Sequence, residues 1–237
     1  MKLQTKLLKA LLPKGGSPNF SKLLDLFSRE DIWDYLGGYE NGSELVRFAK
    51  HGYDDLLVQN HNLFPGDRVL VLGAYKGSSI ERWLQIYEVE VLAIEPISEF
   101  VDFLNCKFAE NKSVTIFPFA VGSVNGDVSL SVDEYSTSSF MRHGISRVVE
   151  LVDVGQFLAS LEKLPRIIEL NIEGGEYDVL ERIIELGFLK SIDCLIIQFH
   201  KYDLRCELRR AQIRLVLAET HNCVFSYEWI WERWQRK

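Results

Sequence analysis

The first segment whose residues could do chemistry is VLVLGAYKGSS (69–79), which is followed by VLAIEP (91–96). An apolar run ends at Gly73 and a helical stretch opens at Gly77, so the backbone between them can approach a ligand closely. The start of the helix adds free N–H donors and the positive end of the helix dipole. Glu95 ends the next apolar run, 22 residues after Gly73 (95 − 73), where a carboxylate can accept both hydroxyls of a ribose. Together these features predict a ligand that contains a nucleoside.

A glycine-rich turn of this kind could also be a tight strand-to-helix connection without a ligand, and the acid at this spacing favours the cofactor site. The full dinucleotide fingerprint G-x-G-x-x-G is absent, because Tyr75 stands where its second glycine would be. That glycine lets a pyrophosphate come close to the backbone. The tyrosine therefore disfavours NAD and FAD and favours a cofactor without phosphates.

A second signal is RIIELNIEGGEYDVLERI (166–183). An apolar run ends there in Asn171 and Glu173, and polar groups directly after a buried strand are costly unless they have partners. The carboxyl ends of strands in open α/β sheets face the crevice that binds ligands, so both residues are predicted to face a site. Gly174-Gly175 could simply make the turn, and Glu176 could be a favourable acid in the first turn of a helix.

From Gly66 onward, apolar runs of strand length alternate with stretches of helical spacing. Such runs suit strands buried on both faces, and helices between them suit parallel crossovers, so the chain is predicted to be an α/β protein with a mostly parallel sheet covered on both faces. The segment 126–132 alternates instead, which indicates a small antiparallel excursion. The predicted strands span 68–74, 90–96, 113–121, 166–172 and 193–199, and the predicted helices span 78–88, 98–109, 153–162, 175–186 and 204–220.

The chain is predicted to consist of an N-terminal helical extension (1–62) and one domain (63–237). The apolar run near the N-terminus is too short for a signal peptide or a membrane span, so we expect a short amphipathic helix packed on the domain and a cytoplasmic protein without stable membrane insertion. The net charge of −7 argues against a nucleic-acid partner and suits a small or glycan-like substrate. The sequence alone does not exclude a local basic patch. Four cysteines without a CxxC pair indicate reduced thiols and no metal site.

Five motifs taken together make the chain similar to the FkbM-type methyltransferases: VLGAYKG, AIEPISEF, FPFAVGSVNGDVSLSV, STSS, and LNIEGGEYDVLE followed by IIQFH. The resemblance covers about residues 66 to 200. It implies a Rossmann-like methyltransferase fold, S-adenosyl-L-methionine as cofactor, and O-methylation of a sugar or glycan intermediate, as in polysaccharide biosynthesis. By this resemblance the first glycine turn holds the methionyl end of the cofactor, Glu95 its ribose, and Phe119 to Val121 lie near the adenine. The expected cofactor residues are Gly73, Ala74, Tyr75, Lys76, Gly77, Glu95, Pro96, Phe119, Ala120, Val121, Asn171 and Glu173.

The chain also departs from the common family pattern. Val71 and Asn171 stand where the family usually has carboxylates, and Tyr75 and Gln198 replace an Asn and an acid. Two neutralised carboxylates at the crevice could weaken cofactor binding, which leaves open a non-catalytic member that binds a nucleoside or a glycan. A nicotinamide-dependent oxidoreductase is a weaker alternative, disfavoured by Tyr75.

His200 is the predicted general base. It follows the last buried apolar run, on the same rim as Asn171 and Glu173, and histidine titrates near neutrality. The alternatives are a histidine that bonds the rim, His143 as the base, or catalysis by positioning alone. Ser138 and Ser139 are candidates for polar contact with the cofactor. The aromatic end (225–234) is predicted to be a last strand packed on the sheet, with a sugar platform or a dimer contact as alternatives; the sequence leaves the oligomeric state open.

Overall fold

The computed structural model describes residues 42–52, 54–132, 137–138 and 145–237. They belong to two compact units, and the boundary between these units along the chain lies between residues 53 and 54. The first unit contributes helix α4 (Gly42–Lys50), and the second begins with the short helix α5 (Asp55–Val58). The predicted domain boundary after residue 62 stays a prediction, and the helices expected before residue 42 lie outside the described residues.

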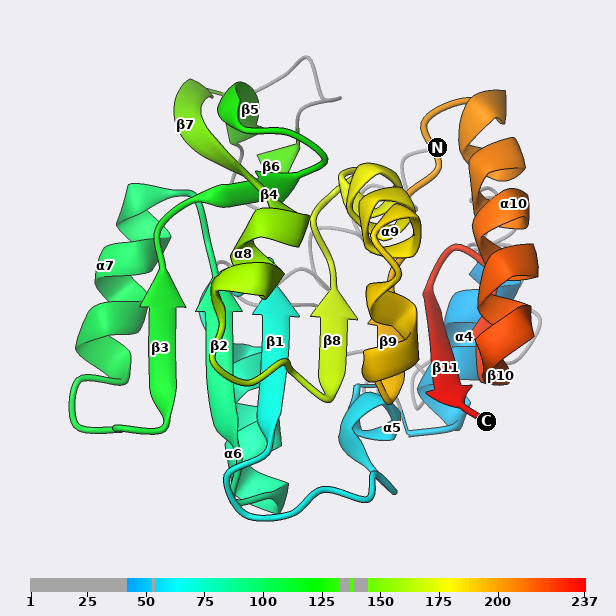
Figure 1. The fold of residues 1–237 in the computed structure, drawn as a ribbon, viewed down its shortest axis with the longest axis horizontal. Helices are drawn as coiled ribbons and strands as arrows, with labels where there is room; N and C mark the ends of the chain where they lie inside the picture. Colours follow the sequence, from blue (N-terminus) through cyan, green and yellow to red (C-terminus); the bar gives the residue numbers. More distant parts are fainter. Residues whose placement is uncertain (1–41, 53, 133–136, 139–144) are drawn as a thin grey trace, which may run out of the picture. The chain divides into compact units, whose positions relative to one another are not determined.

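The second unit is built on a seven-stranded sheet with the order β10-β11-β9-β8-β1-β2-β3 (Figure 1). Five neighbouring strands are parallel and follow the order 3-2-1-4-5 of doubly wound sheets. The chain therefore changes direction between β1 and β8, which is the switch point where such sheets bind ligands. The strands are β1 (Arg68–Leu72), β2 (Glu90–Ile94), β3 (Val114–Phe117), β8 (Ile167–Leu170), β9 (Cys194–Ile197), β10 (His221–Tyr227) and β11 (Trp231–Arg236).

Helices cover both faces of this sheet. In Figure 1, α8 and α9 lie in front of the central strands and α6 lies behind them. Strands β8 and β9 are buried at every position, because water reaches neither face. These features confirm the predicted α/β class and make the fold Rossmann-like. The helices are α6 (Ser78–Ile86), α7 (Ser98–Lys107), α8 (Val154–Ser160), α9 (Glu176–Glu185), the 3-10 helix η1 (Phe188–Ser191) and α10 (Leu204–Thr220).

A second sheet, of order β4-β7-β5-β6, lies between β3 and α8 in the chain. Strand β5 pairs antiparallel with β7, which confirms the predicted antiparallel excursion. The single strand predicted at 113–121 is wrong: it divides into β3 in the large sheet and β4 in the small one. Pro118 lies at the division, where a residue without an N–H cannot continue the hydrogen-bonded ladder. The strands are β4 (Ala120–Gly122), β5 (Gly126–Val132), β6 (Thr137–Ser138) and β7 (Ile145–Asp153).

The C-terminal aromatic segment also differs from the prediction. It forms the antiparallel hairpin β10–β11 in place of one strand, and β11 is inserted beside β9. The connection passes through Trp229, whose φ is 59°. Trp231 and Trp234 are buried, so these aromatic rings pack in the domain as expected and are not an open platform. All four cysteines are free, and none of the helices in the described part combines the length and apolar character needed to cross a bilayer.

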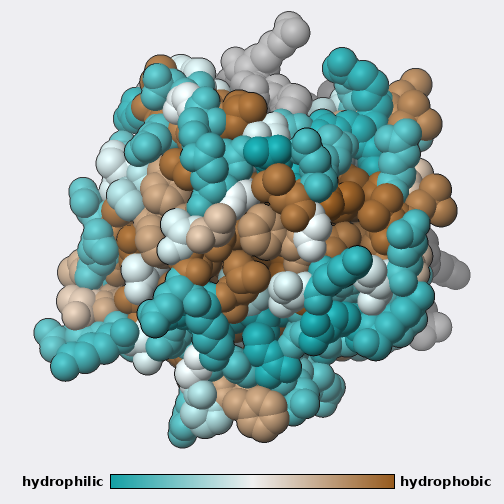
Figure 2. Space-filling view, in the orientation of Figure 1, coloured by the Kyte–Doolittle hydropathy of each residue, from teal (hydrophilic) through white to brown (hydrophobic). Residues whose placement is uncertain are grey.

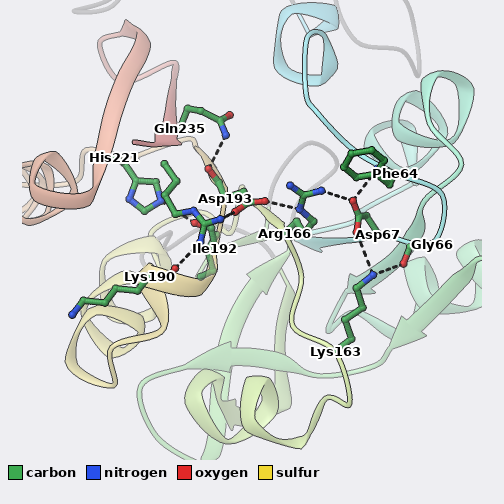
Figure 3. Close-up of polar contacts among 11 residues, drawn as sticks. Phe64, Gly66, Asp67, Lys163, Arg166, Lys190, Ile192, Asp193, His221 and Gln235 are labelled. Carbon is green, nitrogen blue, oxygen red and sulfur yellow. Dashed lines mark hydrogen bonds and ion pairs between the residues drawn. The ribbon is translucent and has the colours of Figure 1, made fainter.

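The amino-terminal ends of three central strands are joined by a charged network (Figure 3). Arg166 lies between two carboxylates, donating from Nη1 to Asp67 Oδ2 (2.6 Å) and from Nε to Asp193 Oδ2 (2.5 Å). Lys163 adds a second cation to Asp67, and Arg236 adds one to Asp193. Because these residues precede β1, β8 and β9 or end β11, the network fixes the relative position of strands at the edge opposite the switch point.

We expect Arg166→Gln to lower the free energy of unfolding by about 1–2 kcal/mol, less than the loss for a fully buried ion pair because water reaches the guanidinium. Urea denaturation measures this difference. The control is Arg147→Gln, which removes the exposed pair between Arg147 and Glu99 and should leave the midpoint unchanged. Equal midpoints for the two variants would contradict a stabilising role of the network.

Candidate ligand-binding site

A cavity of about 270 Å³ opens at the carboxyl ends of β1, β2 and β8, at the switch point of the sheet. Its size is close to the lower end of small-molecule sites. One wall comes from the ends of these strands and the other from the small sheet. The described residues that line it are Gly73, Tyr75, Ile94, Glu95, Pro96, Ala120, Val121, Gly122, Ser123, Val124, Val128, Leu130, Leu151, Asn171, Ile172, Glu173, Gly175 and Asp178.

The turn after β1 has two glycines with different roles. Gly73 has a φ of +85°, and a Cβ there would lie 2.0 Å from the backbone oxygen of Asn171, so the close approach of β1 and β8 requires glycine. Gly77 also has a positive φ, but a Cβ there would meet side chains of Leu104 and Phe108. Gly77 is therefore needed for packing against α7, and it does not line the cavity. Tyr75 does line the cavity, and the centroid of its ring lies 4.5 Å from the ring centroid of Phe100.

Glu95 is buried and faces the cavity at the end of β2. Its Oε2 accepts the N–H of Tyr75 (2.8 Å) and its Oε1 accepts the N–H of Ile97 (3.0 Å). Burial raises the pKa of this carboxyl, although the two N–H groups act in the opposite direction. Each oxygen keeps a second lone pair, so a carboxylate held in this orientation can accept hydrogen bonds from a diol in the cavity.

Asn171 follows β8 and lines the same cavity. Its backbone N–H donates to Leu72, but its side-chain Oδ1 is buried without a hydrogen-bond partner. Buried polar atoms are rarely left in this state. The amide is therefore suited to a ligand that brings a donor group to this end of the strand.

All the charged side chains among the described lining residues are acidic. Glu95, Glu173 and Asp178 are carboxylates, and none of the described residues that line the cavity is Lys, Arg or His. Asp178 is paired with Arg209 (2.5 Å). A cationic or neutral ligand suits such a lining, whereas a pyrophosphate would find no Lys, Arg or His among the described lining residues to bind it.

The wall from the small sheet is the part of the site that sequence reasoning missed. Val128 and Leu130 of β5 and Leu151 of β7 give this side of the cavity an apolar surface. The alternation in 126–132 indicated a strand with two different faces, but nothing in the sequence showed which face would meet the ends of β1 and β8.

His200 lies beside the cavity lining and is held by two carboxylates. Its Nδ1 is 2.9 Å from Glu176 Oε1, and its Nε2 is 3.5 Å from Glu173 Oε2. Glu176 is fully buried and also accepts the N–H groups of Ile172 and Gly174. Glu173 has a φ of 52°, and its backbone oxygen accepts the hydroxyl of Tyr202 (2.8 Å). These contacts fix the turn between β8 and α9 and direct Glu173 toward the cavity.

This arrangement does not favour the predicted role of His200 as general base. Burial alone would lower the pKa of the ring, but the hydrogen bonds and charges of Glu173 and Glu176 outweigh it and raise the pKa to about 10. An imidazolium has no lone pair with which to take a proton. His200 is also absent from the cavity lining, so its geometry is that of a residue that positions Glu173.

The structure brings together eight of the twelve expected cofactor residues at the cavity, and His200 lies behind Glu173. Ala74 is buried, and Lys76 is exposed, with its Nζ 4.9 Å from the centroid of the Tyr75 ring. Phe119 packs in an aromatic cluster with Phe117 and Phe157 and does not line the cavity.

His143 and Ser139 lie outside the described residues, as does the side chain of Ser138. Within the described ranges, no group of three or more His, Cys, Asp or Glu residues could hold a metal ion. The eight that line the cavity are Gly73, Tyr75, Glu95, Pro96, Ala120, Val121, Asn171 and Glu173.

No family model and no curated protein matches the chain. Solved structures that are similar to this chain include a fibrillarin in complex with Nop5p (13% identity, TM-score 0.47, 77% of this chain and 79% of that one). Fibrillarin from Aeropyrum pernix with bound S-adenosyl-L-methionine is 10% identical (TM-score 0.43, 77% and 72%). The N-methyltransferase NodS from Bradyrhizobium japonicum, in complex with S-adenosyl-L-homocysteine, is 12% identical (TM-score 0.42, 91% and 97%).

At these identities and TM-scores, the activity of the chain has to be inferred from its own site. Other matches are described as rRNA methylases. The expected absence of a nucleic-acid partner stays a prediction.

We expect His200→Ala to destabilise the domain by about 2–3 kcal/mol at pH 6, as for the loss of charge-assisted hydrogen bonds. The pKa of the folded ring lies above its ordinary value of 6.5, so this stabilisation is complete below pH 6.5 and is lost as the pH rises toward 10. Urea denaturation of both proteins between pH 6 and pH 10 measures the difference. A difference that stays constant with pH would contradict a protonated ring between the two carboxylates.

Proposed function

We propose that this protein is an S-adenosyl-L-methionine-dependent methyltransferase. The observation that carries the proposal is the chemistry of the switch-point cavity: a fixed carboxylate at the end of β2, an unsatisfied amide oxygen after β8, and a lining with carboxylates and no described cation. S-adenosylmethionine is a nucleoside with a ribose diol, an ammonium group, a sulfonium and one carboxylate, and it has no phosphates. The diol and the two cationic groups suit the lining, whereas the pyrophosphate of a nicotinamide or flavin dinucleotide does not.

The residues present fit this cofactor. Glu95 would accept hydrogen bonds from the ribose hydroxyls, and Asn171 Oδ1 would accept one from the ammonium group. Ala120 and Val121 of β4 would lie near the adenine, as proposed from the sequence. When bound, the cofactor supplies an electrophilic methyl group on sulfur.

For the acceptor we propose a hydroxyl group on a sugar or glycan intermediate, of the kind used in polysaccharide biosynthesis. The support is the sequence resemblance to FkbM-type methyltransferases and the neutral, partly apolar wall formed by Val128, Leu130 and Leu151. In the reaction the acceptor oxygen forms a bond to the methyl carbon, the bond from carbon to sulfur breaks, and the hydroxyl proton leaves. The cytoplasmic location proposed from the sequence is compatible with this activity.

The chain's own residues would orient the acceptor and receive its proton. Glu173 is a carboxylate at the cavity, and we propose that it accepts a hydrogen bond from the acceptor hydroxyl. His200 is the positioning residue that holds Glu173 from behind. Alignment of the oxygen with the methyl group would supply much of the rate, because positioning alone can contribute a large part of catalysis.

Calorimetric titration tests the cofactor. We expect binding of S-adenosylmethionine or S-adenosylhomocysteine and no detectable binding of NAD. Glu95→Gln should weaken binding of the sulfur ligands by about 1.5–3 kcal/mol, since hydrogen bonds to a charged acceptor are lost. The matched control is Glu90→Gln, the same change at the opposite end of β2, which should leave the dissociation constant unchanged. Tight binding of NAD without a response to either sulfur ligand would contradict the proposal.

Transfer of a labelled methyl group tests the activity. We expect transfer to a neutral sugar or glycan acceptor, and we expect Glu173→Gln to lower kcat by roughly 10²-fold or more if the carboxylate takes up the proton, with little change in cofactor binding. The acceptors to compare are neutral glycan fragments, nucleotide sugars and RNA oligonucleotides. Cofactor binding without transfer to any of these would instead favour the non-catalytic alternative.

A further inference from the structure

Helix α10 carries apolar side chains on two opposite faces. One face packs into the domain through Cys206, Ile213 and Leu217, which are buried. The other face holds Leu204, Leu208 and Leu215, which are exposed at 73%, 66% and 73%. Figure 2 shows hydrophobic side chains at the right of the view, over the place that α10 occupies in Figure 1. Exposed leucines gathered in this way mark an interaction surface more often than scattered ones.

The exposed leucines form one straight stripe. Together with the exposed alanines 211 and 218 they occupy positions 204, 208, 211, 215 and 218, which are spaced by four, three, four and three residues. At about 100° per residue these five positions fall within a sector of roughly 80°. The same alternation of three and four residues forms the seam between two packed helices. We refer to these five residues as the α10 stripe.

Charged side chains border the α10 stripe on both sides. Glu207 and Arg214 lie along one border, and Arg205 and Glu219 lie along the other. When two copies of α10 pack antiparallel about a two-fold axis at Ala211, each border faces the same border of the partner helix. Glu207 then faces Arg214 of the other copy, and Arg205 faces Glu219, so all four residues meet an opposite charge.

The apolar residues are complementary in the same arrangement. Leu208 faces Leu215 of the second copy, Leu204 faces Ala218, and the small Ala211 lies at the crossing point, where the two helices come closest. A parallel arrangement brings Arg214 opposite Glu219, but it also brings Glu207 opposite the uncharged Gln212 and leaves Arg205 without an opposite charge. The charges therefore favour the antiparallel pairing.

We propose that two copies of this chain form a symmetric dimer through antiparallel packing of their α10 stripes. The present intramolecular partners of the border residues do not prevent it. Arg205 is paired with Asp203, and Glu207 with Lys201, on the surface, where such pairs contribute little and exchange readily. Arg214 is held by Glu232, which fixes its stem while a second carboxylate approaches.

Sedimentation velocity at increasing protein concentration tests the dimer. We expect the wild-type chain to sediment as a dimer at high concentration and Leu208→Glu and Leu215→Glu to be monomers. The matched control is Val148→Glu, which alters a residue of β7 that is 72% exposed and should leave the dimer intact. A wild-type chain that is monomeric at a concentration on the order of 100 µM would overturn the proposal. So would a variant that keeps its mass but loses thermal stability, because the stripe would then be covered within the same chain.

Charge reversal tests the antiparallel register. Arg205→Glu and Glu219→Arg each place like charges opposite each other at two symmetry-related positions, so each should weaken the dimer about tenfold, which is 1.4 kcal/mol. The double variant restores opposite charges and should recover the wild-type dissociation constant. Circular dichroism confirms that the helices are intact. Single variants without effect, or a double variant weaker than either single variant, would show that these two residues do not face each other and would overturn the antiparallel pairing.

Discussion

The site depends on one close approach between two backbones. Where β1 ends, Gly73 lies so near the backbone oxygen of Asn171 that no side chain fits between them. Parallel strands at a switch point diverge in the connections that follow them, and this contact is the last point at which β1 and β8 are held together. It leaves the amide of Asn171 facing the cavity while the backbone N–H of the same residue is bonded to Leu72.

A buried carboxylate, Glu176, holds the turn that follows β8. Glu176 accepts two backbone N–H groups of the turn and lies 2.9 Å from Nδ1 of His200, so one side chain ties the turn to a residue 24 positions further along the chain. Burying a carboxylate without contact with water is costly unless hydrogen-bond donors satisfy its oxygens. The same bonds hold the turn in a conformation in which Glu173 has a positive φ, which would otherwise be unfavourable.

Much of the fold and part of the site could be predicted from the sequence. Strands buried on both faces leave continuous apolar runs, so β1, β2, β8 and β9 were predicted within a few residues of their ends, and the polar residues that follow them, such as Glu95 and Asn171, were placed correctly at the crevice. The direction of Phe119 could not be predicted, because it depends on where the chain leaves the large sheet at Pro118. The place of Gly77 away from the cavity could not be predicted, because a glycine has the same sequence signature whether a ligand or another helix lies beside it. His200 was placed on the correct rim, but its chemistry depends on two carboxylates that only the folded chain brings to the ring.

The small sheet has a consequence for how this protein could change during evolution. Its strands are hydrogen-bonded to one another and belong to a sheet separate from the seven-stranded one. It nevertheless supplies a whole wall of the cavity through Val128, Leu130 and Leu151, opposite the wall that carries Glu95 and Asn171. Substitutions on β5 and β7 can therefore reshape one wall of the cavity, while the backbone hydrogen bonds of the seven-stranded sheet, which forms the other wall, stay as they are. In a lineage that diversifies, recognition of new molecules would then be acquired by mutation in one segment of the chain, between β4 and α8, without change at the ends of β1, β2 and β8.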